Sequence, residues 1–317
     1  MYIVAPRSKS ATSFQRLIRY DIRIGRCCML KVFVFSYAIC VSRKGKRLLS
    51  WLCLGLSGEG ASPTVSVYLW EERHRYVVKP RPAIIFCPGG AYSRVAKREG
   101  EPVALRFLAM GFQCFILRYT TLSMPFPAAL AELSETVRMV RQKAGEWNID
   151  PDRIVVCGFS AGGHLAASLG VFWNAEFLRR PLGYTGRENR PNGLILAYPV
   201  ITSGQFAHDE SFKNLLGDSY TEKLSLVSLE KQVTEDTPPA FLWHTFEDEA
   251  VPPENALLFA MSMRQKGVST ELHLWPHGCH GLALADDETE RTAEGCADWP
   301  AMAARWIRHL PGNGGRT

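Results

Sequence analysis

The pentapeptide Gly158-Phe159-Ser160-Ala161-Gly162 lies between a short apolar run, RIVVC (153–157), and a helical stretch, AGGHLAASLGVF (161–172). The pattern G-x-S-x-G between a strand and a helix predicts a sharp turn that exposes a serine above a sheet. Glycines flank the serine because side chains would collide in so tight a turn. A plain glycine-rich turn is the alternative, and the correct flanks on both sides favour a nucleophilic Ser160.

Apolar runs and helical stretches alternate on both sides of this turn. Besides 153–157, buried strands are expected at 83–87, 112–118, 193–198, 239–244 and 270–275, and an edge strand at 65–70. Helices are expected at 101–110, 127–147, 161–172, 254–266 and 297–309. This alternation predicts an α/β fold whose mostly parallel, doubly wound sheet is covered on both faces. The polar stretch 202–236 interrupts it and is expected to form a lid-like insertion.

A serine hydroxyl needs a base to become nucleophilic, and the loop PHGCHG (276–281) offers two histidines directly after the last expected strand. His280 is preferred over His277 because it lies further from the strand end and precedes Gly281. His164, four residues after Ser160, is interpreted as a packed histidine that supports the turn.

An acid must orient the base and stabilise its charged form. The segment FEDEAVP (246–252) holds three adjacent acids, so charge alone does not choose among them. Asp248 stands in the pattern D-x-x-V-P and completes the chain order Ser160, Asp248, His280, which is the order found in α/β-hydrolases. Its acidic neighbours are interpreted as solvated side chains.

Backbone amides are expected to stabilise the negative charge that develops on the substrate oxygen. The amide of Ala161 lies at a helix N-terminus, where N–H groups point outward. A second donor should follow an earlier strand, and the loop CPGGAY (87–92) occupies that place in the order. Gly90 and Ala91 are the candidates, with a simple turn as the alternative.

Together these segments resemble the α/β-hydrolase superfamily, and more narrowly its esterase/lipase-like branch related to acetyl-xylan esterases and feruloyl-esterase-type hydrolases. The resemblance covers about residues 60 to 310 and is carried by CPGGAY, KREGEPVA (97–104), GFSAGGHLAASL (158–169), HTFEDEAVPPENAL (244–257) and PHGCHGLALA (276–285). It implies the following site: nucleophile Ser160, acid Asp248, base His280, and an oxyanion hole of Gly90, Ala91 and Ala161. It also implies that neither a metal nor a cofactor is needed.

Two departures from this branch stand out. The branch commonly has a third glycine at the position of Ala91, and many relatives have histidine at the position of Cys87. Arg98 and Glu101 recur in the branch and are expected to form a structural ion pair.

The predicted function is a serine carboxylic-ester hydrolase that acts through an acyl-enzyme on short-chain, acetyl esters of small molecules or carbohydrates. The side chains expected to narrow the acyl pocket are Leu122, Met124, Phe126, Trp173 and Phe177. A peptidase of the prolyl-oligopeptidase type and a non-catalytic binding protein on a hydrolase scaffold are the alternatives. No amine-anchoring element is visible in the sequence, and all three triad candidates are present.

Charge is distributed unevenly over the 317 residues. Residues 1–56 hold eleven Lys/Arg and one acid, whereas the remainder carries a net charge of −4. The mildly acidic body argues against a nucleic-acid partner. We expect 1–56 to be a basic extension outside the fold and 57–317 to be the catalytic domain.

The N-terminal segment also bears on localisation. A basic run and an apolar stretch at 43–56 resemble a secretory signal but begin over forty residues into the chain. Nine cysteines without zinc-type spacing favour a reducing, cytoplasmic location. No membrane span is indicated.

Overall fold

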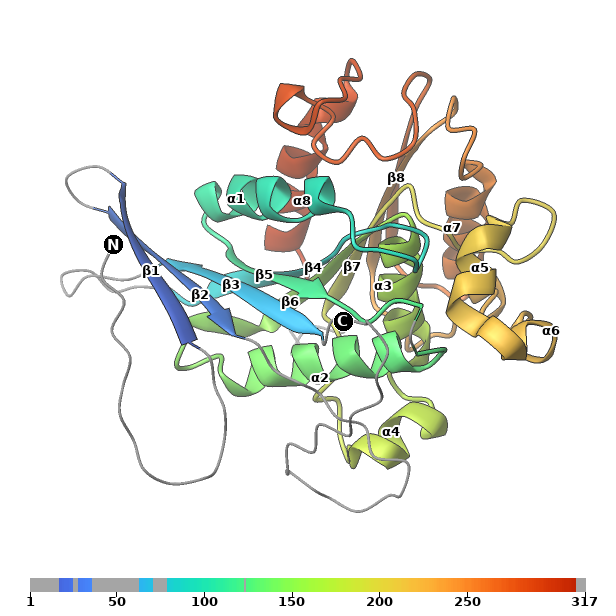
Figure 1. Cartoon of the computed structure of the whole chain (residues 1–317), viewed down its shortest axis with the longest axis horizontal. Coiled ribbons are helices and arrows are strands. Elements are labelled where there is room, and N and C mark those ends of the chain that lie inside the picture. Colours follow the sequence, from blue (N-terminus) through green and yellow to red (C-terminus); the bar gives the residue numbers. More distant parts are fainter. Residues whose placement is uncertain (1–16, 25–27, 36–62, 71–78, 123, 312–317) are drawn as a thin grey trace.

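The computed structural model describes residues 17–24, 28–35, 63–70, 79–122 and 124–311. Nine strands in this part of the chain form one sheet, flanked by helices (Figure 1). The strands are β1 (Leu17–Ile24), β2 (Cys28–Phe35), β3 (Thr64–Trp70), β4 (Arg81–Cys87), β5 (Gln113–Arg118), β6 (Ile149–Phe159), β7 (Gly193–Ala197), β8 (Ala240–Thr245) and β9 (Thr270–Trp275). The α-helices are α1 (Glu101–Ala109), α2 (Ala128–Gln142), α3 (Ala161–Phe172), α4 (Glu176–Leu182), α5 (Asp209–Leu216), α6 (Tyr220–Lys223), α7 (Glu254–Gln265) and α8 (Trp299–Arg308). Short 3₁₀ helices are η1 (Lys97–Glu99), η2 (Gly217–Ser219), η3 (Leu229–Lys231), η4 (Asp287–Thr289) and η5 (Cys296–Asp298).

The strand order is β1-β2-β3-β5-β4-β6-β7-β8-β9. All pairs from β5 to β9 are parallel, and those among β1, β2, β3 and β5 are antiparallel. Every residue of β7 is buried, as expected for a strand in the interior of a sheet that is covered on both faces. The expected mostly parallel, doubly wound sheet is therefore confirmed.

Two apolar layers enclose the sheet. Helices α1 and α8 pack on one face, where Trp243 of β8 stacks on Trp299 of α8 with ring centroids 5.4 Å apart. Helices α2, α3 and α7 pack on the other face, and Figure 1 shows α1 and α8 on the opposite side of the sheet from α2. Helix α2 buries Leu133 and Val137 because its apolar positions recur at helical spacing.

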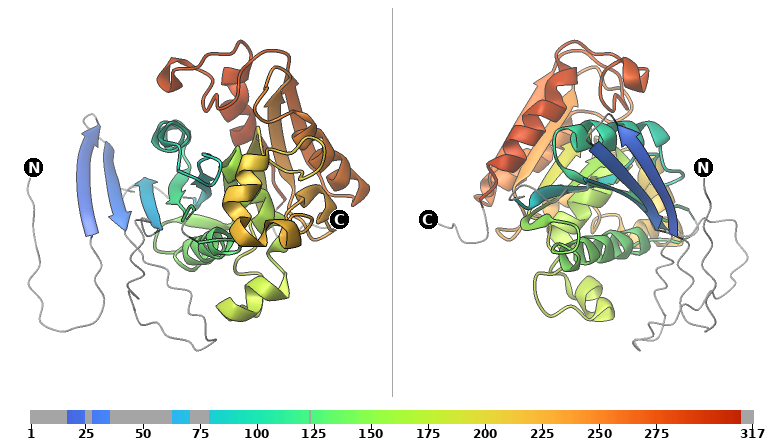
Figure 2. Two further views of the ribbon diagram at one scale, coloured as in Figure 1. Left: turned by 45° about the vertical axis from the view of Figure 1, so that its right-hand side comes forward. Right: turned by 90° about the vertical axis from the view of Figure 1, so that its left-hand side faces the viewer.

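The N-terminal edge of the sheet differs from the sequence-based expectation. Residues 17–24 and 28–35, placed outside the fold by that expectation, pair as antiparallel strands and extend the sheet beyond β3 (Figure 2). Strand β3, expected at an edge, therefore lies between β2 and β5. That residues 57–317 are the catalytic domain stays a prediction, and the signal-like stretch 43–56 lies outside the described residues.

The insertion at 202–236 folds into α5, η2, α6 and η3. The Asn255 side chain fixes its start by accepting the amide N–H groups of Ile201 and Thr202, at 2.8 and 3.0 Å. From α5, Asn214 donates to the carbonyl of Ala91 at 2.8 Å. The insertion is thus anchored against the loop that follows β4.

None of the helices in the described ranges is long and apolar enough to cross a membrane.

Candidate active site

Ser160 occupies the turn between β6 and α3 in a strained backbone conformation. Its φ of 51° and ψ of −121° lie in a region that residues other than glycine rarely adopt. The Ser160 amide donates to the carbonyl of Ala197 at 3.0 Å, and its carbonyl accepts the amides of His164 and Val200 at 3.1 Å each. These hydrogen bonds hold the serine in a conformation that the local sequence alone would not favour.

The glycines of the G-x-S-x-G pattern are required by close backbone contacts. A Cβ atom on Gly158 would overlap the carbonyl oxygen of Gly162. A Cβ atom on Gly162 would overlap the carbonyl oxygen of Cys87, at the end of β4. The turn therefore closes on itself and against the neighbouring strand, which leaves no room for a methyl group.

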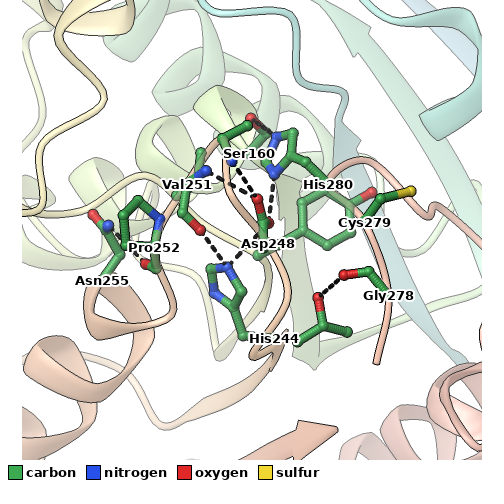
Figure 3. Close-up of polar contacts among 12 residues, drawn as sticks. Ser160, His244, Asp248, Val251, Pro252, Asn255, Gly278, Cys279 and His280 are labelled. Atoms are coloured by element: carbon green, nitrogen blue, oxygen red, sulfur yellow. Dashed lines mark hydrogen bonds and ion pairs between the residues drawn. The ribbon is translucent and has the colours of Figure 1, made fainter. Parts of the chain in front are cut away.

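The structure brings Ser160, Asp248 and His280 together from three separate loops (Figure 3). His280 Nε2 lies 2.8 Å from Ser160 Oγ, and His280 Nδ1 lies 2.7 Å from Asp248 Oδ2. Because an ionised carboxylate only accepts hydrogen bonds, Nδ1 carries the proton and Nε2 can accept the serine proton. Ser160 is 8% exposed and the His280 side chain 23%, so the serine is nearly enclosed while the imidazole still reaches solvent.

The buried Asp248 carboxylate has hydrogen bonds at both oxygens. Its Oδ1 accepts the amides of Ala250 and Val251, and its Oδ2 accepts from His280 and, at 3.2 Å, from His244 Nε2. Burial alone would raise the pKa of this carboxyl, but the hydrogen bonds from His244 and His280 outweigh burial and hold it well below its usual range. Asp248 therefore stays ionised beside His280.

His244 is a residue of the site that the sequence analysis missed. It is fully buried at the end of β8, and its Nε2 contacts the carbonyl of Val251 at 2.8 Å as well as Asp248. It thereby fixes the acid loop on the side away from His280. The sequence does place this histidine four residues before the candidate acid, which could have indicated a contact with Asp248. It was overlooked because it lies at the end of an apolar run that predicts a buried strand.

His277, the competing base, lies in a different environment. Its side chain is 76% exposed, and its Nδ1 lies 2.7 Å from Glu247 Oε1. Glu247 also accepts the amide of Gly278 at 3.1 Å. The structure gives His277 no hydrogen bond to Ser160, so geometry agrees with the preference for His280.

The loop after β4 has an unusual backbone. Gly90, Ala91 and Tyr92 have successive positive φ angles of 122°, 53° and 57°. Among the described residues, no hydrogen bond engages the amide N–H of Gly90, Ala91 or Ala161. These three amides, expected to form an oxyanion hole, are therefore free to donate to a ligand.

His164 supports this loop from α3. Its Nδ1 lies 2.8 Å from Tyr92 Oη and its Nε2 lies 2.8 Å from the carbonyl oxygen of Val227. Burial lowers the pKa of His164 to about 4, so the ring is neutral at pH 7. Nε2–H then donates to Val227 while Nδ1 accepts the Tyr92 hydroxyl. This arrangement matches the supporting role expected for His164 and also ties the loop to the insertion.

The expected ion pair between Arg98 and Glu101 is wrong. Glu101 accepts the Tyr68 hydroxyl at 3.0 Å, and the structure has no ion pair between it and Arg98. Glu99, which directly follows Arg98, is the acid that faces the site. It is 3% exposed and accepts the amide of Gly89 at 2.6 Å. The predicted structural ion pair is therefore absent, and Glu99 is the acid of this motif that contacts the loop after β4.

Two side chains expected in the acyl pocket are distant from Ser160. Trp173 and Phe177 follow the far end of α3, whose twelve residues span about 18 Å. Phe177 instead packs its ring against Phe126, with centroids 5.7 Å apart. Leu122 remains next to the site, because its amide donates to the carbonyl of Tyr92 at 3.1 Å.

Comparisons with known proteins agree with this architecture. The family model described as BD-FAE matches residues 74–263, more than half of the chain. The chain is 41% identical over 234 residues to endo-1,4-beta-xylanase B of Butyrivibrio fibrisolvens, covering 72% of this chain and 36% of that protein. It is 30% identical over 209 residues to acetylxylan esterase of Xylanibacter ruminicola, covering 64% of this chain and 41% of that protein. The chain thus spans less than half the length of either relative.

A solved structure is also similar over most of the fold. The acetyl ester-xyloside bifunctional hydrolase from Caldicellulosiruptor lactoaceticus aligns with a TM-score of 0.69 and 37% sequence identity. The alignment covers 78% of this chain and 88% of that one.

Proposed function

The chain belongs to the BD-FAE family of α/β-hydrolases, and on this premise we propose that it hydrolyses carboxylic esters through an acyl-enzyme on Ser160. The observation that carries the proposal is the hydrogen-bonded line from Ser160 through His280 to Asp248, with successive distances of 2.8 and 2.7 Å. A serine, a histidine and a buried carboxylate in this order can perform nucleophilic acyl transfer.

In the acylation step, His280 Nε2 takes the proton of Ser160 while Oγ attacks the ester carbonyl carbon. The carbonyl π electrons move to oxygen and form an oxyanion, to which the free amides of Gly90, Ala91 and Ala161 would donate. The intermediate collapses, the bond to the alcohol oxygen breaks, and His280 returns its proton to the leaving alcohol. Asp248, still ionised, stabilises the transient imidazolium.

In the deacylation step, water replaces the alcohol. His280 removes a proton from the water as its oxygen attacks the acyl carbon, and the same amides receive the second oxyanion. Collapse releases the carboxylic acid and returns the proton to Ser160 Oγ. In each half-reaction His280 acts first as the base and then as the acid, so it alone suffices for both.

The proposed substrates are short-chain, mainly acetyl, esters of small molecules or carbohydrates. The names of the acetylxylan esterase relative and of the similar acetyl ester-xyloside hydrolase support acetyl as the acyl group of the substrate and a carbohydrate as its alcohol. The contact of α5 with Ala91 and of Leu122 with Tyr92 supports a confined approach to Ser160.

The test is hydrolysis by the wild-type protein and by Ser160→Ala of p-nitrophenyl acetate, butyrate and octanoate, acetylated xylan and an aminoacyl-anilide. We expect rapid turnover of acetate and butyrate, slow turnover of octanoate, and losses of about 10³-fold or more in the folded variant. Normal ester turnover by Ser160→Ala would contradict the nucleophile. A rate that rises towards octanoate would contradict the short acyl group, and preference for the anilide would indicate a peptidase.

A further inference from the structure

Glu99 is a buried acid at the centre of the site that the reaction described above does not use. It ends η1, is only 3% exposed, and lies behind the loop after β4. Burying a carboxylate costs free energy unless hydrogen bonds satisfy its oxygens. Its position beneath the site therefore needs an explanation in terms of its partners.

The two oxygens of Glu99 bind two different loops. Oε2 accepts the amide of Gly89 at 2.6 Å, and Oε1 accepts the hydroxyl of Tyr198 at 2.9 Å. The Tyr198 oxygen in turn accepts the amide of Ala283, also at 2.9 Å. One carboxylate thus connects the loop after β4 with the loop that carries His280.

The same carboxylate lies close to both reacting side chains without touching either. A Cβ atom built on Gly89 would fall 2.8 Å from Glu99 Oε2 and 2.9 Å from Ser160 Cβ, so Gly89 is held between the two residues. A Cβ atom on Gly281, the residue after His280, would fall 3.8 Å from Glu99 Oε1, slightly further than from the guanidinium nitrogens of Arg98 and Arg291, at 3.2 and 3.3 Å. Glu99 therefore lies between the two loops.

Tyr198 completes this connection. Its ring packs edge-on against the His280 ring, with centroids 5.1 Å apart and an interplanar angle of 71°. Its φ of 36° is unusual for a bulky residue, and strained residues persist only where the surrounding structure holds them. Burial raises the pKa of Tyr198, and the Glu99 charge raises it further, so the hydroxyl keeps its proton and donates to Glu99.

We propose that Glu99 is a positioning residue that, through Gly89 and Tyr198, fixes the oxyanion loop relative to the His280 loop. The proposal rests on the ester-hydrolase function proposed above. Glutamine at position 99 keeps the size of the side chain but replaces one acceptor oxygen with a donor. The Gly89 amide can only donate, so it keeps the one remaining oxygen, and the Tyr198 hydroxyl then loses the acceptor to which it now donates.

The experiment compares two matched pairs of variants. Glu99→Gln and Tyr198→Phe each break the connection. As matched controls, Tyr68→Phe removes a similar glutamate–tyrosine hydrogen bond, of 3.0 Å, and Glu101→Gln removes the same negative charge two residues further along the chain, although glutamine can still accept the Tyr68 hydroxyl. We expect the first pair to lose about 10- to 100-fold in kcat on p-nitrophenyl acetate, with KM within about threefold, because small misplacements of reacting groups are costly. The second pair should stay within about twofold of the wild type.

Amide hydrogen exchange supplies a readout that does not depend on activity. In Glu99→Gln, exchange should accelerate in both 88–94 and 278–285, and in neither segment for Glu101→Gln.

Tyr198→Phe leaves the Glu99 carboxylate in place, so this variant alone tests the connection if Glu99→Gln does not fold. A wild-type protein without esterase activity would contradict the proposed function, while the exchange data would still test the connection.

Two results would overturn the proposal. One is a Glu99→Gln variant that keeps its wild-type kcat, and the other is faster exchange confined to 88–94. A loss of kcat that merely follows the melting temperature in all four variants would likewise assign Glu99 a structural role only.

Discussion

Two histidine–carboxylate pairs lie between the same two loops, and they have equal hydrogen-bond lengths but opposite surroundings. Glu247 and His277 meet at 2.7 Å with side chains 58% and 76% exposed, and Asp248 and His280 meet at 2.7 Å with side chains 0% and 23% exposed. Only the second pair reaches a serine. A short contact between a histidine and a carboxylate is therefore not enough to identify a catalytic base.

The difference lies in what surrounds each acid. Hydrogen bonds from His277 and from the Gly278 amide lower the pKa of Glu247, yet water surrounds this carboxylate and screens its charge. Asp248 is removed from water and is fixed by two amides and by His244 in addition to His280. A fixed, unscreened charge can stabilise an imidazolium during turnover, whereas an exposed one adds little.

The largest expected effect comes from removing each histidine in turn. His280→Ala should lower kcat/KM on p-nitrophenyl acetate by at least about 10⁴-fold, because it removes the proton acceptor for Ser160. His277→Ala should stay within about twofold of the wild type, since it breaks only a solvated pair. Steady-state kinetics on both folded variants decides this, and the opposite ranking would mean that the base has been misidentified.

Replacing the two acids should change kcat by somewhat different amounts, and this difference should be smaller than the one between the two histidine variants. Asp248→Asn should cost about 10³- to 10⁴-fold in kcat, because an amide can donate to His280 and thereby favour the wrong tautomer. Glu247→Gln is the matched control in the neighbouring position, and its kcat should change by less than about twofold. Similar losses in both variants would show that the exposed pair also contributes to turnover.

A third histidine isolates the effect of burial, because His164 is buried without a carboxylate partner. Its pKa of about 4 lies below the ordinary value of 6.5, so the unfolded chain binds its proton more readily than the folded chain. The contribution of neutral His164 to stability is fully present above pH 6.5 and is lost as the pH falls towards 4, a change of about 3 kcal/mol.

Urea unfolding of the wild type and of His164→Gln at pH 7, 6, 5 and 4 measures this contribution. The glutamine variant should be less stable at pH 7 but should lose about 3 kcal/mol less on acidification. Parallel stability curves for the two proteins would show that His164 does not titrate on unfolding in this range.

The sequence predicted the parts of the site that depend on local pattern. The turn around Ser160 and the loops of Asp248 and His280 each follow a strand whose apolar run is clear. Chain order then restricts which loops can meet, because parallel strands end at the same edge of a sheet. These predictions needed no knowledge of side-chain packing.

The supporting residues could not be predicted because their partners lie far away in the sequence. Glu99 and Tyr198 are 99 positions apart, and nothing near either residue indicates the other. His244 resembles an ordinary residue of a buried strand until the fold brings Asp248 back against it. The pairing of 17–24 with 28–35 was missed for a different reason, since this segment is basic and its apolar runs lack the clear periodicity that would predict strands.

The closed turn around Ser160 also restricts how this protein can change over generations. Any side chain at Gly158 or Gly162 would overlap backbone atoms that cannot move aside. Substitutions at these two positions should therefore prevent correct folding of the turn, and selection removes them before they can contribute a new activity. The exposed positions of α5 and α6 carry no such restriction. Adaptation to a new ester should therefore begin in the insertion, and random libraries should yield altered specificity there while the surroundings of the nucleophile stay unchanged.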